Sequence, residues 1–273
     1  MQIDNLKKFS EVSNGKFIFD YDLKKTNWFN IGGIAKAYFK PENLRDLINF
    51  LKEFGCKEKI FILGAGSNVL INDSGFDGVV VKLGKNFSNI SILPNNTIVA
   101  GSASIDKKVA EFALENNIGG LEFLSCIPGS IGGGIRMNSG CFGTEFKDIL
   151  ISVQAVDREG KVLTIPSSKI NFEYRKNDLP RDLIFLSASF RGNSKNKNEA
   201  KKYMEVLIKK KEATQPTRVK TGGSTFKNPL SQTNEKVWKL IKSSVPENIS
   251  FGDASISEKH SNFFVNTGKA NSK

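Results

Sequence analysis

A glycine-dense stretch at residues 127–143 constrains the fold of this chain more than any other feature of its sequence. It contains three consecutive glycines, Gly132, Gly133 and Gly134. Because glycine loses more backbone entropy on folding than any other residue, three in a row need a structural reason. Either a ligand lies flat against the backbone here, or another part of the chain crosses it closely. The sequence leaves both explanations open.

A second glycine site, at residues 64–68, reads GAGSN. A Rossmann fingerprint requires a strand, a glycine turn and then a helix. The apolar run at 69–71 favours a strand instead, so that fold does not fit. The backbone N–H groups of a tight glycine loop can still form an anion-binding nest, although an ordinary turn explains the glycines equally well. Two such sites together favour a large phosphate-bearing cofactor.

Apolar periodicity and turn residues predict an α+β protein with several small sheets. The clearest helix covers residues 41–54, where Pro41 suits the first turn, one apolar stripe follows and Gly55 ends it. A hairpin is expected around the turn at 158–160. The other expected helices are 104–116, 198–212 and about 235–243, and the expected strands are 59–63, 69–71, 78–83, 152–157, 161–165, 172–175, 183–190 and about 262–266.

Charge and reactive side chains exclude several classes of protein. The net charge is +12, but lysines are spread along the chain, which indicates a solvated surface rather than a nucleic-acid site. Such a positive field favours small anionic ligands such as nucleotides. His260 is the only histidine, so we predict no metal site. Cys56, Cys126 and Cys141 match no zinc or redox motif and are expected to be reduced thiols.

The location of the protein follows from what its sequence lacks. No segment approaches the roughly 20 apolar residues that a membrane helix needs. The first 20 residues lack the apolar run of a secretion signal. We therefore expect a cytoplasmic protein that enters no membrane and binds no nucleic acid.

Two further segments carry candidate chemistry. Arg175 follows Tyr174 at the end of an expected strand, where a guanidinium can hold a carboxylate through two parallel hydrogen bonds. On these two residues alone, a surface arginine is the better explanation. Ser224 lies in the segment GGSTFKNP at 222–229, on a constrained loop from which it can donate a proton. Acyl transfer is disfavoured, because this segment is not the G-x-S-x-G elbow of serine hydrolases.

Six blocks, taken in order, resemble the UDP-N-acetylenolpyruvoylglucosamine reductase (MurB) family. They are TNWFNIGG at 26–33, GAGSN at 64–68, the glycine-dense stretch at 127–143, YR at 174–175, GGSTFKNP at 222–229 and SEKHSNF at 257–263. The resemblance implies an FAD-binding fold of the vanillyl-alcohol-oxidase (PCMH) type. It implies FAD-binding subdomains at 1–83 and 84–213, followed by a smaller substrate-binding domain at 214–273.

The same resemblance implies an enzyme with FAD as cofactor and NADPH as reductant. It would reduce UDP-N-acetylglucosamine enolpyruvate to UDP-N-acetylmuramate, a peptidoglycan precursor. Arg175 would stabilise the charge that hydride addition leaves beside the substrate carboxylate, and Ser224 would donate the completing proton. Tyr174, Asn228 and His260 would contact the sugar nucleotide. The implied FAD-binding residues are Ile62, Gly64, Ala65, Gly66, Ser67, Asn68, Val69, Ile127, Pro128, Gly129, Ser130, Gly132, Gly133, Arg136 and Gly140.

The sequence also departs from the family. The interval between Arg175 and Ser224 is short, as in the form called type II, which lacks a substrate-covering loop. The family's last strand carries a catalytic glutamate, but this sequence ends at Lys273, so we expect a C-terminally truncated chain. We also expect the protein to be a monomer. Neither Glu145 nor Glu258 is assigned to replace that glutamate. The alternatives are a catalytically impaired FAD-binding fragment and an FAD-dependent hydroxy-acid or lactone oxidoreductase of the same fold.

Overall fold

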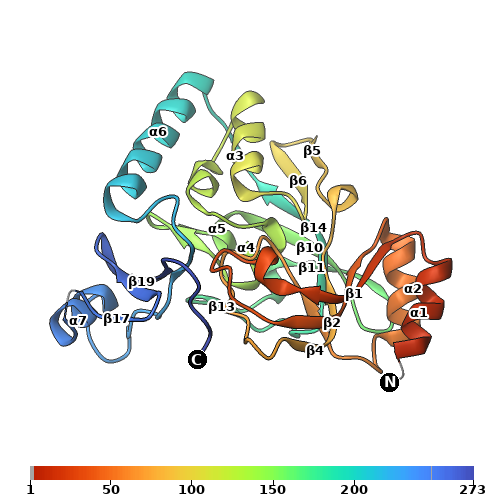
Figure 1. The fold of residues 1–273 in the computed structure, drawn as a ribbon. Helices are drawn as coiled ribbons and strands as arrows, with labels where there is room; N and C mark the ends of the chain where they lie inside the picture. Colours follow the sequence, from red (N-terminus) through yellow and green to blue (C-terminus); the bar gives the residue numbers. More distant parts are fainter. Residues whose placement is uncertain (1–2, 247) are drawn as a thin grey trace. The chain divides into compact units, whose positions relative to one another are not determined.

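The computed structural model describes residues 3–246 and 248–273 and divides the chain into two compact units (Figure 1). Unit 1 consists of Met1–Tyr21, Ala35–Ala65 and Asp77–Ile208, and unit 2 consists of Asp22–Ile34, Gly66–Phe76 and Lys209–Lys273. Helices and mostly antiparallel sheets occur in both units, which confirms the α+β class. The three-part domain division stays a prediction.

The first sheet of unit 1 has the strand order β1-β2-β4-β3, in which β3 and β4 are parallel. Helices α1 and α2 lie side by side next to this sheet (Figure 1), and Phe9 of α1 packs edge-on against Phe54 of α2. Phe17, Phe39 and Phe50 extend this aromatic core. The elements are α1 (Ile3–Val12), β1 (Lys16–Asp22), η1 (Leu23–Thr26), β2 (Ile34–Lys40), α2 (Leu44–Phe54), β3 (Ile60–Ile62) and β4 (Phe76–Val81).

The predicted helix at 41–54 is confirmed but begins later, at Leu44. Asn43 is the N-cap, and its side chain accepts a hydrogen bond from the backbone N–H of Asp46. Such a bond satisfies one of the amides that a helix start leaves unpaired, which fixes the first turn after Pro41. Of the predicted apolar stripe, Leu47, Leu51 and Phe54 are buried, and Leu44 and Ile48 are half-buried.

The second sheet of unit 1 is antiparallel, with the strand order β11-β10-β14-β6-β5. The predicted hairpin is confirmed, and Gly160 in its turn has a φ of 84°. The elements are η2 (Lys85–Phe87), β5 (Ile90–Leu93), β6 (Thr97–Gly101), α3 (Asp106–Glu115), β7 (Ile118–Gly119), η3 (Glu122–Cys126), α4 (Ile131–Arg136), β8 (Gly140–Cys141), β9 (Thr144–Glu145), α5 (Phe146–Ile149), β10 (Leu150–Val156), β11 (Val162–Pro166), η4 (Ser167–Lys169), β12 (Phe172–Glu173), β13 (Lys176–Asn177), β14 (Ile184–Arg191), β15 (Asn193–Ser194) and α6 (Lys197–Thr214).

Unit 2 is built on a four-stranded sheet with the order β16-β19-β18-β17. Its elements are β16 (Thr221–Ser224), α7 (Val237–Ser244), β17 (Ser250–Phe251), β18 (Ala254–Ser257) and β19 (His260–Asn266). Thr221 pairs with Val265 and Ser224 pairs with Phe263, so β16 carries one residue more than β19 over the same interval. This mismatch is a β-bulge immediately before Ser224.

Two expected strands are wrong. Residues 69–71 form no strand, because the adjacent backbone bonds to the 28–33 loop: Gly66 accepts from Trp28, and Asn72 accepts from Gly33. The strand expected at 172–175 is instead a short hairpin of β12 and β13. Arg175 lies in its turn with a φ of 57°, a left-handed conformation that a single continuous strand cannot contain.

Within the described residues, no helix combines the length and apolar character needed to cross a membrane. The same residues contain no group of three or more histidine, cysteine, aspartate and glutamate side chains that could hold a metal ion.

Candidate functional site

The second glycine stretch is packed closely against two other segments of unit 1. Ile131 and Gly132 donate their backbone N–H groups to the carbonyls of Ser104 and Ser102, both over 2.9 Å. A Cβ on Gly132 would lie 3.1 Å from the Ser102 Cβ, and one on Gly134 would lie 2.3 Å from the Phe146 ring. Close chain crossing therefore explains these two glycines. It does not explain Gly133, which is exposed and whose nearest neighbour to an added Cβ is 3.6 Å away.

The two glycine sites meet within unit 1. A Cβ on Gly64 would lie 2.8 Å from the Oγ of Ser130, which belongs to the second stretch and is almost fully buried. Beside this meeting point, the ammonium group of Lys82 donates a hydrogen bond to the carbonyl of Gly64. Burial, and then the charge of Lys40, lowers the pKa of Lys82. The structure thus brings a cation to the backbone of the first loop.

The rest of the first loop belongs to unit 2, where Gly66 makes a tight turn. Its φ is 72°, and a Cβ there would lie 2.2 Å from the carbonyl oxygen of Thr26. Ser67 is half-buried and Asn68 is exposed, so both side chains are accessible. The remaining predicted FAD residues lie beside the loops: Ile62 in β3, Ala65 after Gly64, Val69 after Asn68, and Ile127, Pro128 and Gly129 before α4.

Buried polar atoms beside the second stretch fit a polar ligand. Ser102 Oγ and both carboxyl oxygens of Asp106 are buried and have no hydrogen-bond partner among the described residues. Burial raises the pKa of Asp106 well above its usual range, which favours the neutral form of the carboxyl. Unpaired buried polar atoms are rare in folded proteins, and a bound ligand or water is a usual partner. Because Asp106 Oδ2 lies against Gly129 and the Cβ of Ser102 lies against Gly132, these two side chains suit a nucleotide cofactor held there.

Arg175 is held in unit 1 by three acceptors. Its Nη1 donates to the carbonyl of Asn138 over 3.1 Å and forms an ion pair of 3.3 Å with Glu145. Its Nη2 donates to the carbonyl of Gly140 over 2.9 Å. The guanidinium lies 5.0 Å from the centre of the half-buried Tyr174 ring. A cation fixed in this way at a hairpin turn is suited to binding an anion.

Arg136 occupies a different position. Its guanidinium donates to the carbonyls of Leu179, Pro180 and Leu183 and lies 4.3 Å from the centre of the Phe185 ring. These contacts tie α4 to the segment before β14. The predicted contact of Arg136 with FAD stays a prediction.

Ser224 is exposed at the end of β16 in unit 2. Behind it, Gly222 lies against Phe29, where a Cβ would come within 2.4 Å of the ring. Asn228 Oδ1 accepts from the backbone N–H of Val237, the first residue of α7. The GGSTFKNP segment is therefore fixed at Gly222 and at Asn228, with Ser224 between them.

His260 begins β19 and is half-buried. Burial lowers its pKa, so the ring is neutral at pH 7. Its Nδ1 lies 3.2 Å from the backbone N–H of Asn262, from which it accepts a hydrogen bond. The hydrogen of the neutral ring is then on Nε2, and His260 offers a ligand one donor rather than a positive charge.

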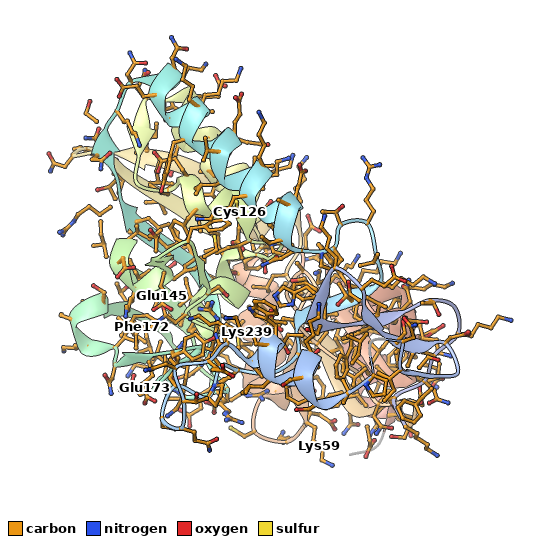
Figure 2. The ribbon with its side chains drawn as sticks, turned by 90° about the vertical axis from the view of Figure 1, so that its left-hand side faces the viewer. Lys59, Cys126, Glu145, Phe172, Glu173 and Lys239 are labelled. Atoms are coloured by element: carbon orange, nitrogen blue, oxygen red, sulfur yellow. The ribbon has the colours of Figure 1, made fainter. Side chains whose placement is uncertain are left out.

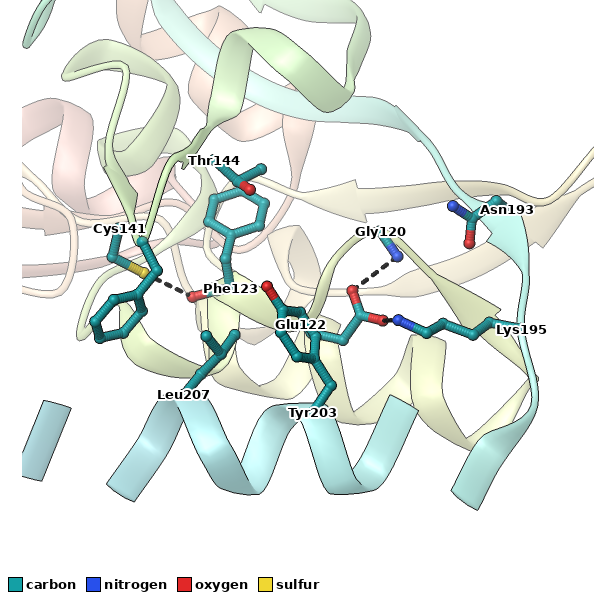
Figure 3. Close-up of a pocket in the computed structure, with 10 residues that line it drawn as sticks. Gly120, Glu122, Phe123, Cys141, Thr144, Asn193, Lys195, Tyr203 and Leu207 are labelled. Carbon is teal, nitrogen blue, oxygen red and sulfur yellow. Dashed lines mark hydrogen bonds and ion pairs between the residues drawn. The ribbon is translucent and has the colours of Figure 1, made fainter. Parts of the chain in front are cut away.

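A separate cavity of about 210 Å³ lies in unit 1 beside α6, which contributes Tyr203 and Leu207 to its wall (Figure 3). Glu122 on its wall is nearly buried, bonds to Lys195 over 2.8 Å and accepts from the backbone N–H of Gly120. Figure 3 shows the Glu122 carboxyl between Gly120 and Lys195, with the thiol of Cys141 on the left-hand side of the view. None of the residues predicted to bind cofactor or substrate lines this cavity.

Sequence reasoning missed several residues of the candidate site. Lys82 carries a signal, since a lysine directly after the apolar run at 78–81 is unusual in a buried strand. Ser102, Asp106 and Asn138 carry none, because only the tertiary structure shows that they are buried against the glycine loops. Glu145 was noticed, but the sequence did not reveal its contact with Arg175.

Comparison with known proteins gives consistent results. Residues 35–166 match the FAD binding domain family, and residues 215–273 match the UDP-N-acetylenolpyruvoylglucosamine reductase C-terminal domain family. The chain is 66% identical to the UDP-N-acetylenolpyruvoylglucosamine reductase of Pelagibacter ubique (strain HTCC1062), over 99% of this chain and 89% of that protein. It is 43% identical to the protein of the same name in Rickettsia bellii (strain RML369-C), over 96% and 86%.

Solved structures agree with these matches. The MurB of Thermus caldophilus superimposes with a TM-score of 0.81 at 27% identity, covering 94% of this chain and 90% of that one. The BBE-like 1 protein of the moss Physcomitrella patens matches with a TM-score of 0.50 at 18% identity, covering 69% and 44%. The latter likeness concerns the fold alone, and it agrees with the predicted vanillyl-alcohol-oxidase type of architecture.

Proposed function

This chain belongs to the UDP-N-acetylenolpyruvoylglucosamine reductase family, and from that premise we propose which of its residues carry each part of the reaction. The enzyme reduces UDP-N-acetylglucosamine enolpyruvate to UDP-N-acetylmuramate, with NADPH as the reductant. Bound FAD would supply the hydride-transfer chemistry that links NADPH to the alkene carbon of the substrate. The residues of this chain bind and orient the reactants and handle charge and protons.

The meeting of Gly64 with Ser130 supports a single cofactor site made from both glycine stretches. Successive backbone N–H groups and the serine hydroxyl suit the cofactor's phosphates. Lys82 adds positive charge at the carbonyl of Gly64. We assign cofactor binding to the residues named from the sequence, with Lys82, Ser102 and Asp106 added.

The position of Arg175 is the observation on which the proposed substrate chemistry rests. Hydride addition to the alkene leaves negative charge conjugated with the substrate carboxylate. A guanidinium already fixed by three acceptors meets that charge without reorganising, which is the most effective form of electrostatic stabilisation. Ser224 then supplies the proton at the carbon next to the carboxylate. Tyr174, Asn228 and His260 complete the substrate contacts.

Rapid mixing separates the two halves of the reaction. FAD-loaded Arg175→Met is mixed first with NADPH and then with the enolpyruvyl sugar nucleotide, and the flavin absorbance is followed. Bleaching by NADPH at the wild-type rate, with recovery slowed by at least about 100-fold, is the expected result for loss of a charge-stabilising group. Recovery at the wild-type rate would remove Arg175 from the reaction.

The location, oligomeric state and domain division of the enzyme belong to the same proposal. The enzyme would act in the cytoplasm, where NADPH and UDP-sugars are made, as a monomer that binds neither nucleic acid nor membranes. Its FAD-binding subdomains would be 1–83 and 84–213, and its substrate-binding domain 214–273. Gel filtration with light scattering checks the monomer: a mass near 30.1 kDa is expected, and a mass near twice that value would reject it.

A further inference from the structure

The residues around Arg175 form a connected polar network in unit 1. Glu145 directs one carboxyl oxygen, Oε1, to Arg175 over 3.3 Å. Its other oxygen, Oε2, accepts from Asn138 Nδ2 over 2.9 Å and lies 3.2 Å from the ammonium group of Lys147. Both oxygens of this carboxylate therefore face donors from different segments of the chain.

Asn138 makes this network rigid. Its side chain is completely buried, and besides Glu145 it bonds to the carbonyl of Glu173 over 3.1 Å and to the backbone N–H of Lys147 over 3.1 Å. Glu173 belongs to the strand that precedes the turn of Arg175. Figure 2 labels Glu145 near Phe172 and Glu173, the two residues of that strand.

Some N–H donors of the Arg175 guanidinium are used by the network, and the others remain available for a ligand. A guanidinium has five N–H donors. The two Nη1 hydrogens are directed to Asn138 and Glu145, and one Nη2 hydrogen is directed to Gly140. Among the described residues, nothing accepts from Nε or from the second Nη2 hydrogen. Two donors of the guanidinium thus stay available for a ligand with two oxygens.

We propose that Glu145 is a positioning residue, whose carboxylate holds the Nη1 end of Arg175 so that the remaining donors meet the substrate carboxylate. The inference rests on the proposed role of Arg175 and goes beyond it, because it names the group that orients that arginine. Glu145 touches no reactant and transfers no proton in this scheme. Its role is to fix the orientation of the Arg175 guanidinium and to keep that group from rotating.

Glu145→Gln is the sharpest variant, because it keeps the shape and changes only the chemistry. All the groups that face the two oxygens among the described residues are donors, namely Asn138 Nδ2, Arg175 Nη1, Lys147 Nζ and the backbone N–H of Asp148. A glutamine must turn its own NH₂ donor toward one side of this set. Either Arg175 or Asn138 then loses its acceptor.

The matched control is Glu173→Gln. Glu173 is the exposed partner of Lys176 across the same hairpin turn, over 3.0 Å. Its side chain does not contact Arg175 in the part of the chain that the structure describes. Any effect of removing one carboxylate from this hairpin should appear in both variants, whereas an effect on Arg175 should appear only in Glu145→Gln.

The experiment follows both halves of the reaction on FAD-loaded protein. Glu145→Gln should slow the substrate-driven recovery of flavin absorbance by about 10- to 100-fold, the range for losing a hydrogen bond to a charged group. The rate of flavin reduction by NADPH in Glu145→Gln should stay within about 2-fold of the wild-type rate. In Glu173→Gln, the rates of flavin reduction and of recovery should both stay within about 2-fold of wild type, as expected for an exposed ion pair. Binding of UDP-N-acetylmuramate, measured by calorimetry, should weaken in Glu145→Gln alone.

The Arg175→Ala background separates positioning from a general structural effect. If Glu145 acts only through Arg175, adding Glu145→Gln to Arg175→Ala should slow recovery no further. An equal additional loss in that background would overturn the inference, and so would wild-type recovery in the single variant. If Arg175→Ala itself recovers normally, the role of Arg175 and this inference fall together. If it recovers slowly while Glu145→Gln does not, only this inference falls.

Glu145→Asp covers the case in which the glutamine variant does not fold. Glu145 is also the N-cap of α5, where its side chain accepts from the third helical residue and Asp148 accepts from its backbone N–H in return. Aspartate is a favourable N-cap and keeps the charge, but it draws the carboxylate back from Arg175. Recovery should be slowed by about 10-fold with the melting temperature retained, and full-rate recovery would overturn the inference.

Discussion

The backbone N–H of Asp106 donates to the carbonyl of Gly129 over 3.2 Å, and this bond joins the start of α3 to the second glycine stretch. The same contact places the Asp106 carboxyl in the interior, where a Cβ on Gly129 would lie 2.7 Å from its Oδ2. A titratable group thereby becomes part of the packing of the cofactor loop. Its protonation state affects the stability of the loop.

Asp106→Asn should raise the stability of the ligand-free protein at neutral pH. Since burial raises the pKa of Asp106 in the folded state, the native protein releases this proton at a higher pH than the unfolded chain does. Stability therefore falls as pH rises from the unfolded pKa toward the raised folded value. The neutral asparagine has no such dependence, and each kcal/mol recovered corresponds to about 2–4 °C in melting temperature.

Thermal unfolding of both proteins between pH 4 and pH 8 checks this expectation. The gap between the two melting temperatures should widen with increasing pH. Parallel curves would mean that Asp106 is not held protonated in the fold.

Gly64→Ala should weaken FAD binding without unfolding the protein. The added methyl group would lie 2.8 Å from the Ser130 hydroxyl, which can rotate away but then turns from the loop. We expect about a 10-fold rise in the dissociation constant for FAD, comparable to losing one hydrogen bond to a charged phosphate. Fluorescence titration of apoprotein with FAD measures it.

Gly84→Ala is the control for that titration. A methyl group at Gly84 meets no atom within 4 Å, so alanine there has room. FAD affinity should stay at the wild-type value in this variant. Equal weakening in both variants would show that the loss at Gly64 is unrelated to its contact with Ser130.

Ser224→Ala should leave the reduction of bound flavin by NADPH intact and slow the completion of the product. Without the hydroxyl, the charge formed on the substrate has no proton donor at that position, and general acid catalysis is worth about 10²- to 10⁴-fold. The rate of UDP-N-acetylmuramate formation, measured by chromatography of quenched samples, should fall within that range. Ser243→Ala provides the comparison, because the hydroxyl of this serine of unit 2 donates to the carbonyl of Leu240 within its own helix and bonds to no other described residue. A normal rate for Ser224→Ala would assign the proton to another group.

Gly222→Ala should destabilise unit 2. Its methyl group would come within 2.4 Å of the Phe29 ring, closer than packed atoms tolerate, and overpacking of this kind costs about 1–3 kcal/mol. Limited proteolysis should cut the segment after Lys209 faster than in the wild-type protein, with unit 1 cut at an unchanged rate. Proteolysis equal to wild type throughout would show that Phe29 moves aside at little cost.

Local sequence patterns predicted the elements whose signals are local. The stripe of α2 and the glycine turn at Gly160 were correct, since periodicity and a positive φ act within a few residues. The strand at 69–71 was wrong because the neighbouring backbone bonds to a loop about 40 positions earlier in the chain. Such long-range pairing leaves no periodic trace in a three-residue run.

The residues of the candidate site differ in the same way, since some carry a local sequence signal and others are fixed by tertiary packing. The glycine loops carry their own motif, and the resemblance to a known family singled out Arg175 and Ser224. The turn conformation of Arg175 and its partners Asn138 and Glu145 depend on how the β12–β13 hairpin packs against α4 and β9. No single segment contains that information, so sequence reasoning noticed Glu145 without finding its role.

The bulge before Ser224 puts that serine on the same face of the sheet as Thr221, although the two residues are three positions apart. Side chains alternate between the two faces of a regular strand, so without the extra residue a spacing of three would put them on opposite faces. With the extra residue, Thr221 and Ser224 pair with Val265 and Phe263, which lie on one face of β19. Deleting one of the two glycines between them would restore a regular ladder and still leave the serine opposite Phe263, so a single deletion should remove the bulge without turning the proton donor to the other face.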